Sequence, residues 1–356
     1  MLQSRLARII ENMRRTSLRQ ILVSAPASVF YLTGRWIHPG ERMLALYIRD
    51  DGTLTLFANR LFALAGSVSV PLIEYDDTDD CIKILSEQLL PGTLGIDKTW
   101  PSLFTIRLME ARSDIRPVLG SHCVDDARLC KDEAELALMR ESSRKNDETI
   151  GQVIRQLQCG MTEADVAENY KKISASLGSS RPSFSPLICF GANCAEPHHD
   201  TDHTVLKNGD SVILDVGLTW KSYCSDMTRT VFMGAPTDEQ KRVYDLVCAA
   251  NAAGRAAVRP GIPLCEVDRA ARKVIEDGGY GPQFIHRTGH GIGLEVHEFP
   301  DVSMTSQIIA KPGMIFSVEP GIYLPGKFGV RVEDLVVVTE DGCETLNAAP
   351  REITIL

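Results

Sequence analysis

Five residues of the types that bind metal ions lie in the last two-fifths of the chain. Each belongs to a short motif: Asp215 in L-D-V-G-L, Asp226 in Y-C-S-D-M-T-R-T, His290 in H-R-T-G-H-G-I-G, Glu319 in S-V-E-P-G and Glu333 in G-V-R-V-E-D. Four carboxylates and one imidazole form a hard, oxygen-rich ligand set, which suits Mn²⁺, Co²⁺ or Zn²⁺ in a two-metal site better than a closed structural zinc site. Two such ions about 3.5–4 Å apart can activate water and stabilise an oxyanion. Hydrolysis is therefore the first hypothesis.

A weak internal repeat pairs these carboxylates with one another. The segment G-M-T-E-A-D-V at 160–166 matches G-I-P-L-C-E-V at 261–267, and K-N-G-D-S-V-I-L-D-V-G at 207–217 matches K-P-G-M-I-F-S-V-E-P-G at 311–321. Asp215 thus corresponds to Glu319, and the two side chains must point to the same sheet face to share a site. Asp226 and Glu333 follow them by 11 and 14 positions, whereas His290 has no partner. We expect two copies of a unit of two helices, a strand and a β-ribbon, with the metals where the copies meet.

The composition limits the class of protein. A chain of 356 residues is long enough for two domains, each with its own core. The net charge of −9 provides no basic surface, so neither nucleic acid nor a membrane is expected as a partner. The N-terminus lacks the apolar core of a signal peptide, and no apolar run approaches the ~18 residues of a membrane span, which indicates a soluble, cytoplasmic protein. The ten cysteines form no C-x-x-C pair, and we interpret them as reduced thiols.

The first 120 residues alternate short β-rich and helical runs, as α/β domains do. Strands are predicted at 20–24, 43–48, 53–57 and 93–96, with a hairpin turn at 50–52, and helices at 79–90 and 101–112. The polar stretch 117–131 predicts a domain boundary near residue 123. The apolar spacing that follows predicts a long helix over 132–157.

The five ligand residues and their flanking motifs resemble the pita-bread metallopeptidases, a family that includes methionine aminopeptidase, aminopeptidase P and prolidase. The resemblance covers residues from about 130 to 350, and the first 120 residues resemble the creatinase/prolidase N-terminal domain. It implies a mixed α/β (α+β) fold, with a creatinase-type N-terminal domain at 1–123 and a pseudo-twofold pita-bread catalytic domain at 124–356. Within the family, the chain is most similar to prolidase-like Xaa-Pro peptidases.

The resemblance also implies a role for each ligand. Asp215 would bind one metal ion through both oxygens, His290 and Glu319 would bind the other, and Asp226 and Glu333 would bridge the two ions. Glu319 is also the expected general base, because one carboxylate oxygen can bind metal while the other accepts a proton from the attacking water.

Two further histidines align with catalytic histidines of the family. His198 in A-E-P-H-H-D and His297 in L-E-V-H-E-F-P would flank the scissile amide, stabilise the tetrahedral intermediate or pass a proton to the leaving nitrogen. The repeat relates them at an offset of 99. His286 would line the substrate pocket, and Arg331 would brace the carboxylates or the substrate. A salt bridge at a strand edge is the alternative for Arg331.

Other positions are interpreted as structural or depart from the family pattern. His199 and His203 lack a counterpart in the repeat and are read as structural. The glycine-rich segment 289–293 lacks the spacing of a dinucleotide loop and is expected to permit close backbone packing near the metal. Some prolidases carry a basic residue after the H-E-x-P run that can meet the C-terminal carboxylate of a dipeptide, whereas this chain has Asp301, which weighs against a strict dipeptidase. Ser222 replaces a frequent glycine and is expected to alter its loop slightly.

The segment Y-L-T-G-R-W-I-H-P-G at 31–40 is rich in aromatic and basic groups for a loop. In the family, the corresponding region reaches the active site of the partner subunit in a dimer. We hypothesise that Arg35, Trp36 or His38 does so here and limits substrate length, which makes a homodimer the expected assembly and His38 a substrate-binding residue. The alternative is a surface loop that packs its own tryptophan.

The sequence therefore predicts an enzyme that uses two divalent metal ions to hydrolyse the peptide bond before proline, with Mn²⁺ expected and Co²⁺ or Zn²⁺ as alternatives. Xaa-Pro dipeptides are the leading substrates, and longer peptides with proline at the second position, as for aminopeptidase P, are the alternative. The rivals are creatinase-like hydrolysis without metal and a non-enzymatic binding protein on the same scaffold. Those branches of the family have lost metal ligands, all of which are present here.

Overall fold

The computed structural model describes residues 2–356, which form two compact units that divide after Arg128. The predicted boundary near residue 123 lies inside a helix, α5 (His122–Leu129). The polar stretch that suggested a linker is a strand followed by this helix, which has no wide apolar stripe to reveal it. The division into units therefore comes a few residues later than the composition indicated.

The first unit is built on one six-stranded mixed sheet with strand order β4-β3-β2-β1-β5-β6. Its elements are α1 (Leu2–Arg15), β1 (Gln20–Val23), α2 (Pro26–Thr33), β2 (Ala45–Arg49), β3 (Leu54–Asn59), η1 (Arg60–Phe62), β4 (Leu72–Tyr75), α3 (Cys81–Ser86), β5 (Gly92–Ile96), α4 (Ser102–Ala111), β6 (Ile115–Leu119) and α5. The four predicted strands and both predicted helices are present, although α3 is shorter than predicted. Gly52, at φ 94°, closes the predicted hairpin between β2 and β3.

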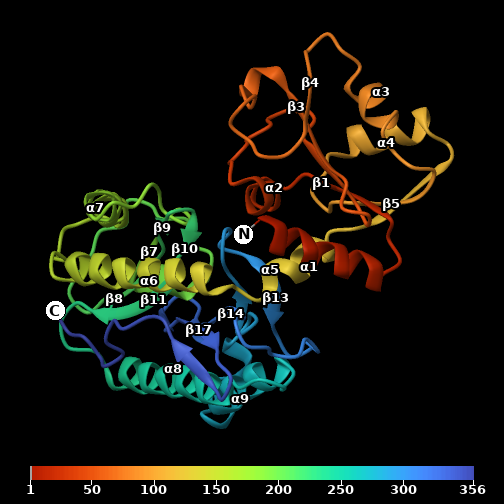
Figure 1. Cartoon of the computed structure of the whole chain (residues 1–356). Coiled ribbons are helices and arrows are strands. Elements are labelled where there is room, and N and C mark those ends of the chain that lie inside the picture. The colour runs from red at the N-terminus through yellow and green to blue at the C-terminus, as the bar shows by residue number, and fades with distance from the viewer. Residues whose placement is uncertain (1) are drawn as a thin grey trace. The chain divides into compact units, whose positions relative to one another are not determined.

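The second unit contains two successive sets of helices and strands. The first set is α6 (Glu133–Ile154), α7 (Glu163–Ser176), β7 (Leu187–Phe190), η2 (Gly191–Ala195), β8 (Ser211–Val216), β9 (Thr219–Trp220), β10 (Tyr223–Cys224) and β11 (Met227–Phe232). The second is α8 (Asp238–Ala257), α9 (Cys265–Asp277), η3 (Gly281–Gln283), β12 (Gly289–Gly291), β13 (Glu298–Val302), β14 (Ile315–Val318), β15 (Gly321–Leu324), β16 (Phe328–Arg331), β17 (Asp334–Val338) and β18 (Cys343–Thr345). Figure 1 shows α6 and α8 on opposite sides of the strands, as expected for a helix-covered central layer.

The predicted internal repeat is confirmed by the strand pairing. In the first set, β8 and β11 pair antiparallel, with Val216 opposite Met227; in the second, β14 and β17 pair antiparallel, with Val318 opposite Asp334. The long helix predicted over 132–157 is α6, which begins with a capping box at Asp132. Each set therefore presents one antiparallel strand pair whose ends can carry chemistry.

A buried ion-pair network holds the start of β17 against the C-terminal segment. Asp334 is completely buried, and its oxygens accept hydrogen bonds from Arg229 at 2.8 Å and Arg351 at 2.7 Å. Arg229 also donates to the carbonyl of Glu333 at 2.6 Å. Although burial opposes ionisation, the two guanidinium groups hold the pKa of Asp334 below its usual range. The network therefore fixes the backbone where β17 begins.

None of the helices within residues 2–356 has both the length and the apolar character of a membrane span.

The Asp334 network gives a stability prediction. Asp334→Ala leaves the guanidinium groups of Arg229, Arg351 and Arg255 without this anionic partner, so we expect a loss of about 3–5 kcal/mol in the free energy of unfolding. Glu344→Ala is the matched control, because it removes a 2.7 Å ion pair to Arg140 in which both side chains are well exposed, and it should cost about 0–1 kcal/mol. Urea denaturation of the metal-free proteins measures both values, and equal losses would contradict this account.

Candidate metal centre

One cavity of ≈ 220 Å³ in the second unit brings the predicted site residues together. Its lining includes all five predicted metal ligands and four of the other predicted residues: Asp215, Asp226, His290, Glu319, Glu333, His198, His286, His297 and Arg331. The remaining one, His38, lies in the first unit, in the loop after α2, with its side chain exposed. Residues separated by more than 130 positions along the chain thus meet around one space.

The repeated strand pairs explain why the four carboxylates converge. Asp215 lies near the end of β8 and Asp226 immediately before β11, so the β8–β11 pair holds both at one end. Glu319 directly follows β14 and Glu333 directly precedes β17, which is the same arrangement in the second set. Glu333 also donates its backbone N–H to the carbonyl of Thr228 on β11 at 3.1 Å, which joins the two sets.

His290 comes from a third strand, β12, which pairs with both β13 and β14. Its backbone N–H donates to the Ser317 hydroxyl at 3.0 Å, and that hydroxyl donates to Oε1 of Glu319 at 3.0 Å. The ring Nε2 lies 3.6 Å from Oδ2 of Asp226 and 3.4 Å from Oε1 of Glu319. The imidazole therefore faces the carboxylates from the second set of strands.

The residues present fit a divalent metal site. Asp226, His290 and Glu333 each offer a ligand atom, and these atoms lie within 4.8 Å of one another. One oxygen each of Asp215, Asp226 and Glu333 is buried and, within residues 2–356, accepts no hydrogen bond. Buried carboxylate oxygens without partners are costly, and cations are the groups that would satisfy them. A metal centre is therefore the simplest reason for this arrangement.

The electrostatics of the carboxylates agree with this interpretation. Burial, followed by repulsion from neighbouring carboxylates, raises the pKa values of Asp226 and Glu333 well above their usual range. Burial also raises the pKa of Glu319 to about 7, although Arg331 opposes the shift. Burial lowers the pKa of His290 to about 3, so its imidazole is neutral and can donate a lone pair. The cluster is poor in compensating positive charge, which bound cations would supply.

Arg331 is the buried cation of the cavity. Its Nη2 donates to Oδ2 of Asp215 at 2.6 Å, Nη1 to the Tyr323 hydroxyl at 2.9 Å and Nε to the Thr228 hydroxyl at 3.1 Å. The Thr228 hydroxyl donates in turn to Oε2 of Glu333 at 2.8 Å. Arg331 therefore contacts one predicted ligand directly and another through Thr228. It is buried inside the unit and does not form a solvated strand-edge salt bridge.

The hydrogen bonds around His286 define its tautomer. Its Nδ1 lies 2.7 Å from the carbonyl of Arg287, which can only accept, so Nδ1 carries the proton. Burial lowers the pKa of His286 to about 4, so the ring is neutral and Nε2 accepts from the Tyr323 hydroxyl at 2.8 Å. Arg331, Tyr323 and His286 thus form one hydrogen-bonded chain that ends on the backbone of the 286–288 segment.

His198 and His297 are exposed to the cavity, and each is followed by an anchored residue. After His198, His199 Nε2 lies 2.9 Å from Oε2 of the completely buried Glu163 on α7. Glu163 also accepts from the backbone N–H groups of Phe190 and Asp202, so we interpret His199 as structural.

After His297, the buried carboxylate of Glu298 accepts from Lys131 at 3.3 Å and from the backbone N–H groups of Leu294 and Glu295. The turn that carries His297 is therefore held by a buried ion pair, just as the loop that carries His198 is held by Glu163. Both histidines can thus present their rings to the cavity from fixed backbones.

The glycine-rich segment 289–293 packs closely, as the sequence predicts. A Cβ atom at Gly289 would overlap the carbonyl of Ser317, and one at Gly291 would lie 2.6 Å from the carbonyl of Phe299. Ser222 has φ 78°, in the left-handed region that favours glycine, so the serine adopts a backbone conformation that glycine reaches more easily.

The sequence did not identify Arg287, which lines this cavity, or Tyr323 and Thr228, which bind Arg331 behind the lining. Thr228 lies within the D-M-T-R-T motif and is opposite Asp215 in the strand register, so its alternation with the ligands could have indicated it. Tyr323 follows the S-V-E-P-G motif on β15, and only the pairing of β15 with β16 places it beside Arg331. Arg287 was not considered because attention went to His286 and His290, which lie close to it in the sequence.

Comparisons with known proteins agree with this geometry. Residues 137–340 match metallopeptidase family M24, and residues 5–130 match the creatinase/prolidase N-terminal domain. An uncharacterized peptidase of Staphylococcus aureus is 32% identical over 353 residues, covering 96% of this chain and 98% of that protein. The crystal structure of a dipeptidase from Pyrococcus horikoshii is 34% identical, with a TM-score of 0.94 over 99% of this chain and 100% of that one.

A prolidase structure from Thermococcus sibiricus is 33% identical, with a TM-score of 0.95 over 100% of this chain and 99% of that one. The two family matches together cover both units of the chain, and the proposed ligand set lies in the second unit. The chain is therefore a hydrolytic enzyme that belongs to metallopeptidase family M24 and carries a creatinase/prolidase N-terminal domain.

Proposed function

We propose that the protein is a prolidase, which hydrolyses Xaa-Pro dipeptides with the help of two divalent metal ions. The observation that carries the proposal is the convergence of four carboxylates and one neutral imidazole on one cavity, with three buried carboxylate oxygens lacking hydrogen-bond partners within residues 2–356. The similarity to a dipeptidase and to a prolidase over nearly the whole chain supports this substrate class.

Asp215, Asp226, His290, Glu319 and Glu333 would hold the ions, with Asp226 and Glu333 as bridges. Mn²⁺ is the ion we propose, because oxygen-rich sites with a single imidazole favour it, and Co²⁺ or Zn²⁺ are the alternatives. When bound, the ions would polarise the substrate carbonyl, lower the pKa of water and offset the charge of the developing oxyanion.

The side chains of the cavity would supply the proton transfers. Glu319, whose pKa burial raises to about 7 in the metal-free chain, is placed to accept a proton from the attacking water. His198 and His297 line the cavity from two different loops and can hydrogen-bond the carbonyl oxygen or return a proton to the proline nitrogen. The second proton transfer matters because the tertiary amide has no proton of its own and its nitrogen must leave as an amine.

His286 and Arg331 have supporting roles in the cavity. His286 and Arg331 line the cavity beside the proposed metal ligands, but their polar atoms already bind Tyr323, Thr228, Asp215 and the backbone. We propose that they shape the substrate pocket and orient Asp215, and that direct polar contacts to the substrate come from other residues.

The alternative within the same chemistry is an aminopeptidase that acts on longer peptides with proline at the second position. The two activities differ only in whether the proline carboxylate is free, so they share every metal ligand. A creatinase-like enzyme without metal and a binding protein without activity are less well supported, because the full ligand set is present and convergent.

We also propose that the protein forms a homodimer in which the 35–38 loop limits substrate length at the partner's active site. Trp36 stacks on Phe30 at 4.8 Å and on His38 at 6.3 Å between ring centroids, so the loop packs its own tryptophan, which was the alternative interpretation. The two interpretations are compatible, because this stack leaves the side chains of Arg35 and His38 exposed. A cytoplasmic location stays a prediction of the sequence.

The substrate class can be tested with purified protein reloaded with Mn²⁺, Co²⁺ or Zn²⁺. We expect hydrolysis of Ala-Pro, with little hydrolysis of Ala-Ala and a lower kcat/KM for Ala-Pro-Ala, measured by release of proline or alanine. Glu319→Gln should lower kcat by about 10²–10⁴-fold, because the general base is lost. Faster cleavage of Ala-Pro-Ala than of Ala-Pro would establish the aminopeptidase alternative.

Removal of the metal should make stability depend on pH. The folded metal-free chain holds protons on Glu319, Asp226 and Glu333 more tightly than the unfolded chain does. The stability that these protons confer is complete below the unfolded pKa of about 4.5 and is lost as the pH rises through about 7. We expect the unfolding temperature in EDTA to fall by roughly 5 °C or more between pH 5 and pH 8. Saturating Mn²⁺ should flatten this dependence in calorimetry, and parallel curves with and without metal would argue against it.

The loop proposal predicts a change in substrate length preference. Trp36→Ala and His38→Ala should each shift the ratio of kcat/KM for Ala-Pro over Ala-Pro-Ala by about threefold or more. Leu61→Ala is the control, because Leu61 is 69% exposed on η1 of the same unit. Light scattering gives the oligomeric state of each variant. If the ratio of kcat/KM for Ala-Pro over Ala-Pro-Ala were unchanged in both loop variants, the proposal would be wrong.

A further inference from the structure

Arg287 is a cationic side chain that lines the cavity of the metal centre and has no role in the chemistry described so far. It lies between His286 and Thr288, in the segment that leads from α9 to β12. Its side chain is exposed, whereas Thr288 and His290 are buried. Arg287 therefore stands at the mouth of the cavity, within reach of a molecule that enters it.

The backbone around Arg287 is firmly anchored to α9. Arg272 donates to the carbonyls of Phe284 at 3.0 Å and His286 at 2.9 Å. Asp268, which is completely buried, accepts from the backbone N–H of Thr288 at 3.1 Å and from its hydroxyl at 2.8 Å. The carbonyl of Arg287 itself accepts from His286 Nδ1 at 2.7 Å. The segment is thus held in place by α9 and by its own histidine.

The guanidinium group of Arg287, in contrast, takes part in no hydrogen bond or ion pair anywhere in residues 2–356. The other arginine of the cavity, Arg331, uses Nε, Nη1 and Nη2 on Thr228, Tyr323 and Asp215. His286 uses both ring nitrogens and is neutral, because burial lowers its pKa to about 4. Arg287 is therefore the permanent positive charge of this cavity that remains available to a ligand.

A free carboxylate is the group that such a cation would recognise. An anchored arginine can bind a carboxylate through two parallel hydrogen bonds, and little ordering of the backbone is then needed. In an Xaa-Pro dipeptide, the carboxylate carbon is two bonds from the scissile nitrogen, so this charge must enter the same cavity as the reacting amide. An internal proline carries a neutral amide there instead.

We propose that Arg287 binds the free C-terminal carboxylate of the dipeptide and is the residue that makes the enzyme prefer dipeptides. The inference rests on the proposed Xaa-Pro hydrolysis and deepens it, because it names the group that distinguishes a dipeptidase from an aminopeptidase. Asp301 stands where some prolidases have a basic residue for the dipeptide carboxylate, and Arg287 would supply that positive charge instead. The carboxylate of Asp301 accepts from the Ser303 hydroxyl, and Asp301 is not among the residues that line the cavity.

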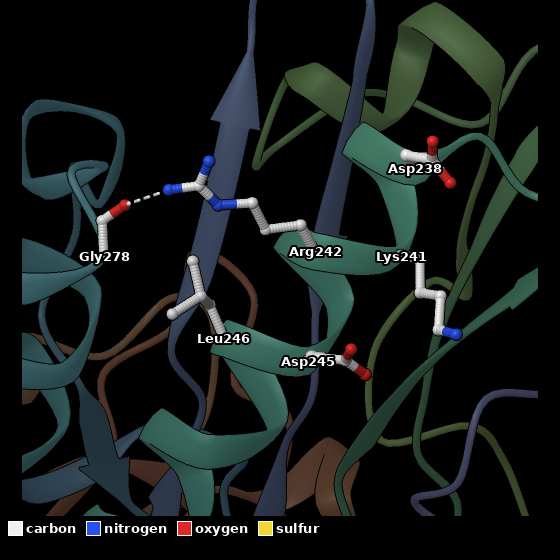
Figure 2. Close-up of a pocket in the computed structure, with 6 residues that line it drawn as sticks. All are labelled: Asp238, Lys241, Arg242, Asp245, Leu246 and Gly278. Atoms are coloured by element: carbon white, nitrogen blue, oxygen red, sulfur yellow. Dashed lines mark hydrogen bonds between the residues drawn. The ribbon is translucent and has the colours of Figure 1, made fainter.

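A matched control lies in a separate pocket of ≈ 440 Å³ on α8 (Figure 2). Arg242 lines this pocket with Asp238, Lys241, Asp245, Leu246 and Gly278, and its Nη2 donates to the carbonyl of Gly278 at 3.2 Å. None of the proposed metal ligands or catalytic histidines lines it. Arg242→Gln therefore removes an arginine from the same unit without touching the proposed chemistry.

The experiment compares Ala-Pro with Ala-Pro-amide in the full-length, Mn²⁺-loaded protein and its variants. Arg287→Gln should raise KM for Ala-Pro by about 10–100-fold, the effect of one charge-assisted hydrogen-bonded pair, and change kcat by less than about threefold. The kcat/KM for Ala-Pro-amide should change by less than about threefold. Arg287→Lys should recover part of the loss for Ala-Pro, and Arg242→Gln should match the unaltered protein on both substrates.

Several results would overturn the role of Arg287. These are an equal loss for Ala-Pro and Ala-Pro-amide in Arg287→Gln, or an unaltered protein that cleaves the amide as efficiently as the acid. A separate calorimetric titration with L-proline and L-prolinamide reports on the carboxylate without turnover, and Arg287→Gln should weaken only the binding of proline. If no Xaa-Pro substrate is cleaved, the proposed function fails. In that case, the role of Arg287 is judged from the titration. It fails if the unaltered protein does not bind proline, or if Arg287→Gln binds proline as tightly as the unaltered protein does.

Discussion

The burial and mutual repulsion of clustered carboxylates, two of them almost completely buried, are the constraint on which the rest of this structure depends. Asp226 and Glu333 are almost completely buried and have pKa values well above their usual range. A cluster of this kind opposes folding unless positive charge enters it or protons neutralise it. Because the carboxylates repel one another, other contacts of the fold must hold the proposed ligands in place.

The structure meets this requirement chiefly by anchoring the backbones on either side of the carboxylates, and single hydrogen bonds from Ser317 and Thr228 orient Glu319 and Glu333. Arg229 and Asp334 fix the backbone beside Glu333, and the β8–β11 register fixes Asp215 and Asp226. Arg331 contacts Asp215 directly and so supplies one permanent positive charge. The remaining lone pairs of the carboxylates stay available for cations. Rigid positioning combined with unsatisfied oxygens is what a preorganised metal centre requires.

Much of this site could be predicted because its ligands lie in local motifs that recur in the repeat. Asp215 and Glu319 are equivalent in the repeat, so the pattern alone places them at equivalent ends of the strand pairs β8–β11 and β14–β17. The contacts that depend on three-dimensional pairing could not be predicted in this way. Tyr323 lies beside Arg331 only because β15 pairs with β16, and the availability of Arg287 is visible only after the partners of Arg331 are known. In the first unit, α5 was missed because a short, largely polar helix gives no clear periodic signal.

The strand register also shows why the proposed metal-ligand set contains one histidine and not two. In the first set, Cys189 on β7 is opposite Ile213 on β8; in the second, the register of β12 against β14 places His290 opposite Ser317. Ile213 and Ser317 are equivalent in the repeat, so Cys189 occupies the position that corresponds to His290. Burial raises the pKa of the Cys189 thiol far above its usual range, and Cys189 is not among the residues that line the cavity. The two halves therefore supply equivalent carboxylates but different third groups, and the two proposed metal positions must differ in ligand type even though the surrounding fold is nearly symmetric.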